Sequence, residues 1–171
     1  MRRIAALTRN PAVLALVMAL AVTGCASKKI PNSAADIGLG GAGAGGSAQP
    51  GTQQDFTVNV GDRIFFDTDS SVVRADAQQI LARQAQWLNQ YPSYTITVEG
   101  HADERGTREY NLALGARRAA AARDFLVSRG VPGNRLRTIS YGKERPVAVC
   151  DDISCWSQNR RAVTLLGGAG S

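Results

Sequence analysis

Asp103 and Arg118 are the residues whose charge and spacing most directly suggest ligand chemistry. The stretch Val98–Arg118, VEGHADERGTREYNLALGARR, places Asp103 in a loop just before an expected helix start at Thr107. Side chains on a helix lean toward its N-terminus, so Arg118 reaches back toward the loop that carries Asp103. Asn111 precedes Arg118 by about two helical turns and shares its face. An anion and a cation that face one cleft suit a zwitterionic ligand.

His101 is the one histidine of the chain, and it limits what catalysis the sequence could support. A Ser/His/Asp or Cys/His arrangement would have to be built on this residue alone. A typical zinc cluster needs more imidazole or thiolate ligands than remain. We therefore expect no catalytic site, no metal and no cofactor.

The elements that position these residues can be read from the hydrophobic pattern. Strand-like alternation is expected in Tyr94–Glu99, Arg135–Tyr141 and Arg161–Leu166, and earlier in Thr57–Val60 and Arg63–Phe66, which form a short pair or one strand bent at Gly61. A first helix from about Val72 to Asn89 is expected, capped by Asp69 or Ser70, with an apolar stripe of Ile80, Gln84, Trp87 and Leu88.

The second helix has the clearest signals. Thr107 caps it, Glu109 favours its positive end, and Gly130 with Pro132 ends it. Its inner stripe is expected to comprise Leu114, Ala121, Phe125 and Leu126. The order β-α-β-α-β-β predicts an α/β sandwich with both helices packed on one face of a mixed sheet, in a single domain over residues 56–166 and followed by a short tail, 167–171.

The N-terminal third has a different character. Residues 1–24 have a basic start, an apolar run and then small residues, as in a secretory signal peptide. Without the three arginines of that segment the formal net charge falls from +6 to +3, and we expect no nucleic-acid partner. Residues 25–55 are rich in glycine and predict a flexible linker. Its G-x-G-x-x-G at Gly38 follows no strand, so we interpret it as linker and not as a dinucleotide site.

The stretch GHADERGTREYN followed by LGARRA resembles the peptidoglycan-binding signature of the OmpA-like domain family, in the form found in peptidoglycan-associated lipoproteins. The likeness extends through FFDTDSSVV, YPSYTITVEG, ISYGKERP and SQNRRAV, over about two thirds of the chain. It implies the same α/β architecture. It also implies binding of meso-diaminopimelate in the peptidoglycan stem peptide, with Asp103 taking the ammonium and Arg118 the carboxylate.

The resemblance implies further site residues and partners. Asp67 corresponds to a family position that lines the same pocket, and Asn111 and Arg105 are further candidates. Val22-Thr23-Gly24-Cys25 resembles a lipobox, so Cys25 would carry a lipid, and Ala26 after it resembles lipoproteins sorted to the outer membrane. The domain would then face the periplasm. Membership of the Tol-Pal system, acting in envelope integrity and in outer-membrane constriction at cell division, implies TolB as a partner that competes with peptidoglycan.

Cys150 and Cys155 remain once Cys25 is assigned to lipid. They form an even pair in a compartment that favours oxidation, which predicts a disulfide closing a small loop. Two alternatives to a peptidoglycan tether stay open at this point. The domain could be a periplasmic cell-wall hydrolase that uses His101 and Asp103, or a wall-binding subunit of another envelope complex.

Overall fold

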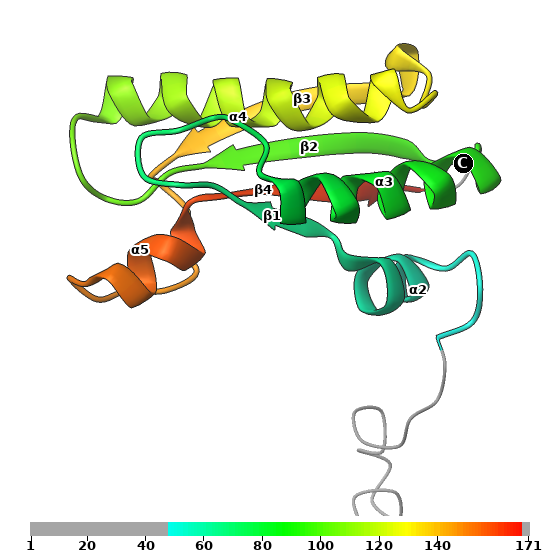
Figure 1. Cartoon of the computed structure of the whole chain (residues 1–171), viewed down its shortest axis with the longest axis horizontal. Helices are drawn as coiled ribbons and strands as arrows, with labels where there is room; N and C mark the ends of the chain where they lie inside the picture. Colours follow the sequence, from blue (N-terminus) through cyan, green and yellow to red (C-terminus); the bar gives the residue numbers. More distant parts are fainter. Residues whose placement is uncertain (1–47, 169–171) are drawn as a thin grey trace, which may run out of the picture. The chain divides into compact units, whose positions relative to one another are not determined.

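A computed structural model describes residues 48–168 of the chain (Figure 1). The expected signal peptide 1–24, the expected lipidation site Cys25, the linker up to residue 47 and the tail residues 169–171 lie outside this range.

The centre of the domain is a four-stranded mixed sheet in the order β1-β4-β2-β3. β4 is antiparallel to both of its neighbours, and β2 and β3 are parallel. β1 is therefore parallel to β2 with β4 inserted between them, which is a split β-α-β arrangement. The strands span Arg63–Phe65 (β1), Thr95–His101 (β2), Leu136–Gly142 (β3) and Arg161–Gly167 (β4).

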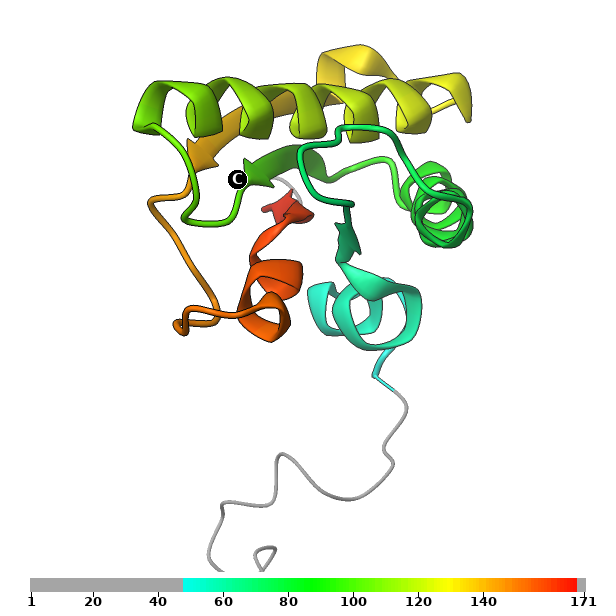
Figure 2. The same ribbon diagram turned by 60° about the vertical axis from the view of Figure 1, so that its left-hand side comes forward.

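Two long helices, α3 (Ala75–Gln90) and α4 (Arg108–Ser128), pack against one face of this sheet (Figures 1 and 2). One apolar core contains Leu81 and Leu88 of α3, Leu126 of α4, and Ile96 and Val98 of β2. Since Ile96 and Val98 alternate to the same side of β2, both helices cover that side. The predicted α/β sandwich with two helices on one face is confirmed.

Two glycines allow α4 to lie unusually close to β2. A Cβ added to Gly115 would lie 2.8 Å from the carbonyl oxygen of Gly100 and closer still to the Ser140 hydroxyl. A Cβ on Gly100 would in turn overlap the Gly115 carbonyl. Because neither backbone can move away without disturbing the core, any side chain here separates helix from strand. This contact fixes the height of α4, and so of Arg118, above the sheet.

The segment before β1 differs from the prediction. Thr57–Val60 does not form a strand but belongs to a π-helical turn, η1 (Phe56–Gly61), which follows the short helix α2 (Gln53–Asp55). Phe56 is 1% exposed and packs on Trp87 with the ring centroids 5.0 Å apart. The Asp55 carboxylate accepts hydrogen bonds from Trp87 Nε1 and Asn59 Nδ2, both at 2.8 Å. These contacts outweigh the alternating pattern, and they place residues before 56 within the folded unit.

The first long helix begins later than expected, at Ala75, and neither Asp69 nor Ser70 caps it. Arg74 occupies the cap position without a side-chain hydrogen bond. The Ser70 hydroxyl instead accepts from the Val72 amide, and Asp69 turns into a left-handed conformation with φ 54°. Within the expected stripe, Gln84, Trp87 and Leu88 are buried.

The second long helix follows the prediction closely. The Thr107 side chain accepts from the Tyr110 amide at 3.2 Å, as predicted for the cap. Leu114 and Leu126 are buried as expected, whereas Ala121 and Phe125 are only partly buried. Ala119 and Ala122 contribute to the buried face instead. The predicted cap is confirmed, and the stripe is rotated slightly from the predicted one.

Two further short elements, besides α2 and η1, were not expected. A 3-10 turn, η2 (Gly133–Arg135), precedes β3, and a seven-residue helix, α5 (Ile153–Asn159), precedes β4. The Asp152 carboxylate caps α5 by accepting from the Ser154 amide at 2.7 Å. The side chain of Asn159, at the end of α5, accepts from the amides of Val147 and Ala148. α5 is therefore fixed at both ends.

Candidate functional site

Asp103, Arg105 and Asn111 meet at one cavity of about 240 Å³. Three segments form its wall: the loop between β1 and α3, the loop between β2 and α4, and the first turns of α4. The lining residues are Thr68, Asp69, Asp103, Arg105, Gly106, Tyr110, Asn111 and Leu114. The sequence predicted three of these as site residues, and the fold brings all three together.

Asp103 is a buried carboxylate, 7% exposed, surrounded by two arginines. Its Oδ1 accepts from the Arg105 amide and Nε, both at 3.2 Å, and its Oδ2 accepts from Arg105 Nη2 at 2.8 Å and Arg160 Nη1 at 3.2 Å. Burial alone would raise the pKa of Asp103, but the hydrogen bonds from Arg105 and Arg160 outweigh it and lower the pKa below its usual value. The group is an anion at neutral pH.

Arg105 is the more exposed of the two arginines beside Asp103. Its side chain is 41% exposed, compared with 7% for Arg160. Its guanidinium also lies over the indole of Trp156, 4.2 Å from the ring centroid. Arg160 is anchored a second time, through a hydrogen bond from Nε to the Phe66 carbonyl at 3.2 Å. Arg105 can therefore leave the carboxylate more readily than Arg160 can.

Arg118 has no solvent exposure and is the largest fully buried side chain among the described residues. Its Nε donates to the Ser70 carbonyl at 2.8 Å, Nη1 to the His101 carbonyl at 2.8 Å and Nη2 to the Asp67 carbonyl at 3.1 Å. Arg118 thus joins the two loops that line the cavity. A guanidinium has five N–H donors, so Nη1 and Nη2 each keep one. Burial lowers the pKa of Arg118 to about 10, which leaves it charged at neutral pH.

Asn111 and Asp67 differ in how they reach the site. Asn111 is 2% exposed and donates from Nδ2 to the Arg105 carbonyl at 2.7 Å, so it holds the loop that carries Asp103. The Asp67 side chain is 67% exposed and pairs with Arg74 at 3.2 Å, outside the cavity lining. Asp67 takes part through its carbonyl, which Arg118 holds. A ligand contact from the Asp67 carboxylate stays a prediction.

Asp69, Tyr110, Arg160 and Trp156 are residues of the site that were not assigned to it from sequence. The Tyr110 hydroxyl donates to the Asp69 carboxylate, and both residues line the cavity. This hydrogen bond raises the pKa of Tyr110. Tyr110 and Leu114 lie four residues apart on one helix face beside Asn111, a spacing that could have indicated them. Arg160 and Trp156 lie more than fifty residues from their partners along the chain, so spacing gives no signal for them.

His101 lies outside the cavity lining. Its ring is 2% exposed, stacks on Tyr141 with centroids 5.6 Å apart, and has Nε2 3.6 Å from a Glu99 carboxylate oxygen. Burial, together with the charges of Arg161 and Arg145, lowers the pKa of His101 to about 4. The imidazole is therefore neutral near pH 7, and within residues 48–168 no hydrogen bond or ion pair joins it to Asp103.

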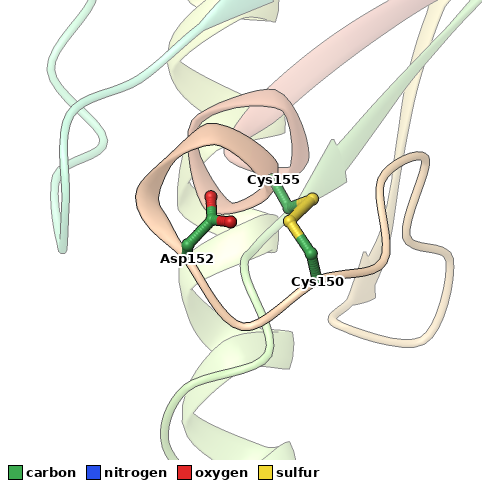
Figure 3. Close-up of side chains that lie close together, drawn as sticks. All are labelled: Cys150, Asp152 and Cys155. Atoms are coloured by element: carbon green, nitrogen blue, oxygen red, sulfur yellow. A yellow bond between two sulfur atoms is a disulfide. The ribbon is translucent and has the colours of Figure 1, made fainter.

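Cys150 and Cys155 are joined by a disulfide at the start of α5 (Figure 3). With the nearby Asp152 carboxylate they form the one group of potential metal ligands found within residues 48–168. Metal binding by cysteine requires the thiolate, and the disulfide occupies both sulfurs. Asp152 is already engaged in capping α5. This group therefore secures the helix start.

None of the helices in residues 48–168 combines the length and the apolar character that crossing a bilayer requires.

Comparison with known proteins gives consistent matches. The model of the OmpA family matches residues 65–160. A peptidoglycan-associated lipoprotein of Mesorhizobium japonicum is 80% identical over 171 residues, covering 100% of both chains. The protein of that name from Pseudomonas aeruginosa is 40% identical over 156 residues, 88% of this chain and 92% of that protein.

Solved structures agree with these matches. The crystal structure of the peptidoglycan-associated lipoprotein from Burkholderia pseudomallei superposes with a TM-score of 0.64 at 39% identity, covering 68% of this chain and 100% of that one. The C-terminal domain of Helicobacter pylori MotB superposes with a TM-score of 0.59 at 26% identity, covering 63% of this chain and 84% of that one.

Proposed function

Because the chain belongs to the OmpA family, and within it to the peptidoglycan-associated lipoproteins, we propose that it anchors the outer membrane to peptidoglycan without covalent attachment to the wall. Cys25 carries the lipid, the domain faces the periplasm, and the cavity binds the free end of meso-diaminopimelate in a stem peptide. The protein acts by binding and not by catalysis.

The observation that carries this proposal is the environment of Asp103. An ionised carboxylate at a cavity, with one exposed arginine and one anchored arginine as partners, can accept a ligand ammonium in place of the exposed arginine. The ammonium then has a charged partner, so its desolvation is offset. Arg160 keeps the carboxylate in position throughout.

The ligand carboxylate needs donors on the opposite wall. Within residues 48–168 the amides of Thr68 and Asp69 donate to no protein acceptor, and both residues line the cavity. Arg118 holds the carbonyls on either side of them, at Asp67 and Ser70. We assign the carboxylate to the amides of this loop and to the positive charge of Arg118, which lies behind the loop and has no solvent exposure of its own.

The resemblance to the peptidoglycan-associated lipoproteins also supports a place in the Tol-Pal system. TolB would bind a surface that overlaps the cavity, so that TolB and peptidoglycan compete. Such competition would let the anchor detach and move during cell division. Saturating TolB should then release the domain from peptidoglycan, and simultaneous binding of both would contradict the shared surface.

A binding experiment with matched variants tests the central proposal. Residues 46–171, which contain the whole of the described domain, are sedimented with diaminopimelate-type peptidoglycan. Asp103→Asn keeps the shape of the side chain and removes its charge, and we expect at least tenfold weaker binding. Asp124→Asn is the control, because Asp124 lies on α4 with its side chain 64% exposed.

The two variants separate the possible outcomes. If the parent and Asp124→Asn sediment and Asp103→Asn does not, the anchor function and its central anion are supported. Equal sedimentation of all three, or of none, would contradict the proposed site. Lysine-type peptidoglycan, which lacks the second carboxylate, should bind more weakly than the diaminopimelate type.

A further inference from the structure

We propose that Trp156 is a positioning residue of the ligand site, which keeps Arg105 at the cavity when a ligand takes its place on Asp103. Arg105 would then exchange the Asp103 carboxylate for the carboxylate of the ligand. This inference rests on the proposed function, since it assumes a ligand with both an ammonium and a carboxylate.

The guanidinium of Arg105 contacts one partner through its edge and another through its face. Its edge donates to Asp103 through Nε at 3.2 Å and Nη2 at 2.8 Å. Its face lies over the Trp156 indole, 4.2 Å from the ring centroid. A cation attracted to an aromatic face keeps its N–H groups free for other acceptors. The contact with Trp156 therefore does not depend on the bonds to Asp103.

Trp156 is itself fixed in place from several sides. Its Nε1 donates to a Glu104 carboxylate oxygen, and its amide donates to the Asp152 carbonyl at 3.1 Å. The preceding residue, Cys155, is bonded to Cys150. α5 thus presents the indole. The disulfide closes the loop at the start of this helix (Figure 3). An anchored ring can hold the arginine without moving with it.

The exchange follows from counting charges around Asp103. Before binding, one carboxylate faces two guanidinium groups, from Arg105 and Arg160. When a ligand ammonium reaches Asp103, three cations would surround one anion unless Arg105 turns away. The carboxylate of the same ligand provides the new partner, because it has more lone pairs than the Thr68 and Asp69 amides occupy and a guanidinium can donate to those that remain. Without the indole, Arg105 would move into solvent and this second ion pair would be lost.

The proposal predicts a change in ligand selectivity. Trp156→Leu should weaken binding of a diaminopimelate muropeptide roughly three- to tenfold, the range expected for one partly exposed cation–π contact. The same variant should bind the matching lysine muropeptide as the parent does, because that ligand has no second carboxylate for Arg105. Arg105→Met should produce the same selective loss.

Three further variants make the test specific. Trp156→Phe keeps an aromatic face and removes Nε1, so its selectivity should stay near that of the parent. The double variant Trp156→Leu/Arg105→Met should be no weaker than Arg105→Met alone, because the two residues act as one unit. Phe65→Leu is the control for losing an exposed aromatic side chain, since Phe65 is 39% exposed on β1.

Calorimetric titration of residues 46–171 with each muropeptide gives the dissociation constants, after circular dichroism has established folding. Equal loss for both ligands, or additive losses in the double variant, would overturn the positioning role. If Trp156→Leu does not fold, Trp156→Phe and Arg105→Met still decide the question. If Trp156→Phe loses the selectivity for the diaminopimelate muropeptide and Arg105→Met keeps it, Arg105 does not exchange Asp103 for the ligand carboxylate. If the parent binds neither muropeptide, the proposed function itself fails.

Discussion

Arg118 and Arg105 serve the same cavity in opposite ways. Arg118, with the carbonyls of Asp67, Ser70 and His101 that it bonds, forms the base of the site and has no solvent exposure. Arg105, with Asp103 and Trp156, forms the rim, and its side chain is 41% exposed. The base pairs a cation with neutral carbonyls, whereas the rim pairs it with an ionised carboxylate.

Because of this difference, the base stabilises the fold, whereas the rim can exchange one ion-pair partner for another when a ligand binds. A guanidinium bonded to three backbone carbonyls fixes the loops, since breaking the contacts would leave several buried polar groups without partners. The rim ion pair is partly solvated, so solvent screening limits its contribution to folding. The same solvation lets a ligand replace one ion by another at little cost. We therefore expect substitutions at the base to unfold the domain, and substitutions at the rim to change binding.

The largest effect should come from Arg118→Met. Methionine fills much of the volume but leaves the carbonyls of the base unpaired, so we expect the free energy of unfolding to fall by about 3–5 kcal/mol. Arg117→Met is a matched control on the next residue, which is exposed, and should change stability by less than about 0.5 kcal/mol. Urea unfolding of both variants measures the difference. Similar stabilities would contradict the structural role of the base.

The second-largest effect should be a pH dependence of stability that comes from His101, at the base of the site. The pKa of His101 is lowered from 6.5 to about 4 in the folded domain, so the unfolded chain binds a proton first as the pH falls. Stability is therefore complete above pH 6.5 and decreases between 6.5 and about 4, by on the order of 3 kcal/mol. His101→Phe keeps the stack on Tyr141 and removes the titration. Its unfolding free energy should stay flat over this window, and a slope like that of the parent would exclude His101 as the cause.

The rim should behave differently over the same pH window. The pKa of Asp103 is lowered below 3.8 by Arg105 and Arg160 against the opposing effect of burial, so the carboxylate stays ionised while His101 titrates. Ligand binding by the folded fraction should therefore persist down to about pH 4 as the base loses stability.

The contrast between base and rim also explains how much of the site could be predicted from sequence. Asp103 and Asn111 lie at the same cavity, as their spacing predicts, because local signals position them: Thr107 caps α4, and helical spacing then sets the face of Asn111. The charge of Arg118 was predicted to face the ligand, but its burial and its carbonyl partners depend on the close approach of Gly100 and Gly115. A sequence pattern gives a direction for a side chain and not the depth at which it lies.

Long-range contacts account for most of what the sequence did not reveal. Thr57–Val60 alternates like a strand, yet the contacts of Phe56 and Asp55 with Trp87 select a helical turn. α5 is too short to show a periodic pattern, and its closure by Cys150 and Cys155 determines where Trp156 points. The rim is therefore assembled from distant parts of the chain, and the local sequence of each part does not indicate a binding site.

The disulfide should have an intermediate effect that reaches the rim. Cys150→Ser/Cys155→Ser removes a small closed loop, and we expect the free energy of unfolding to fall by about 2 kcal/mol. Because Trp156 follows Cys155 directly, the variant should also lose part of the selectivity for carboxylate-bearing ligands. In the parent, a thiol reagent should label Cys150 and Cys155 only after reduction. Labelling of the untreated protein would show that the bond does not form.

The smallest effect should come from Asp67→Ala, which separates the side chain of this residue from its backbone. The carboxylate is 67% exposed and its partner Arg74 is 44% exposed, so losing the pair should change stability by less than about 0.5 kcal/mol. Alanine keeps the carbonyl that accepts from Arg118 at 3.1 Å. Peptidoglycan binding should therefore stay within about twofold of the parent, in contrast to Asp103→Asn. If Asp67→Ala instead abolishes binding in a folded domain, its carboxylate must turn into the cavity when the ligand arrives. The loop between β1 and α3 would then contribute to the base through the Asp67 carbonyl and to the rim through the Asp67 carboxylate.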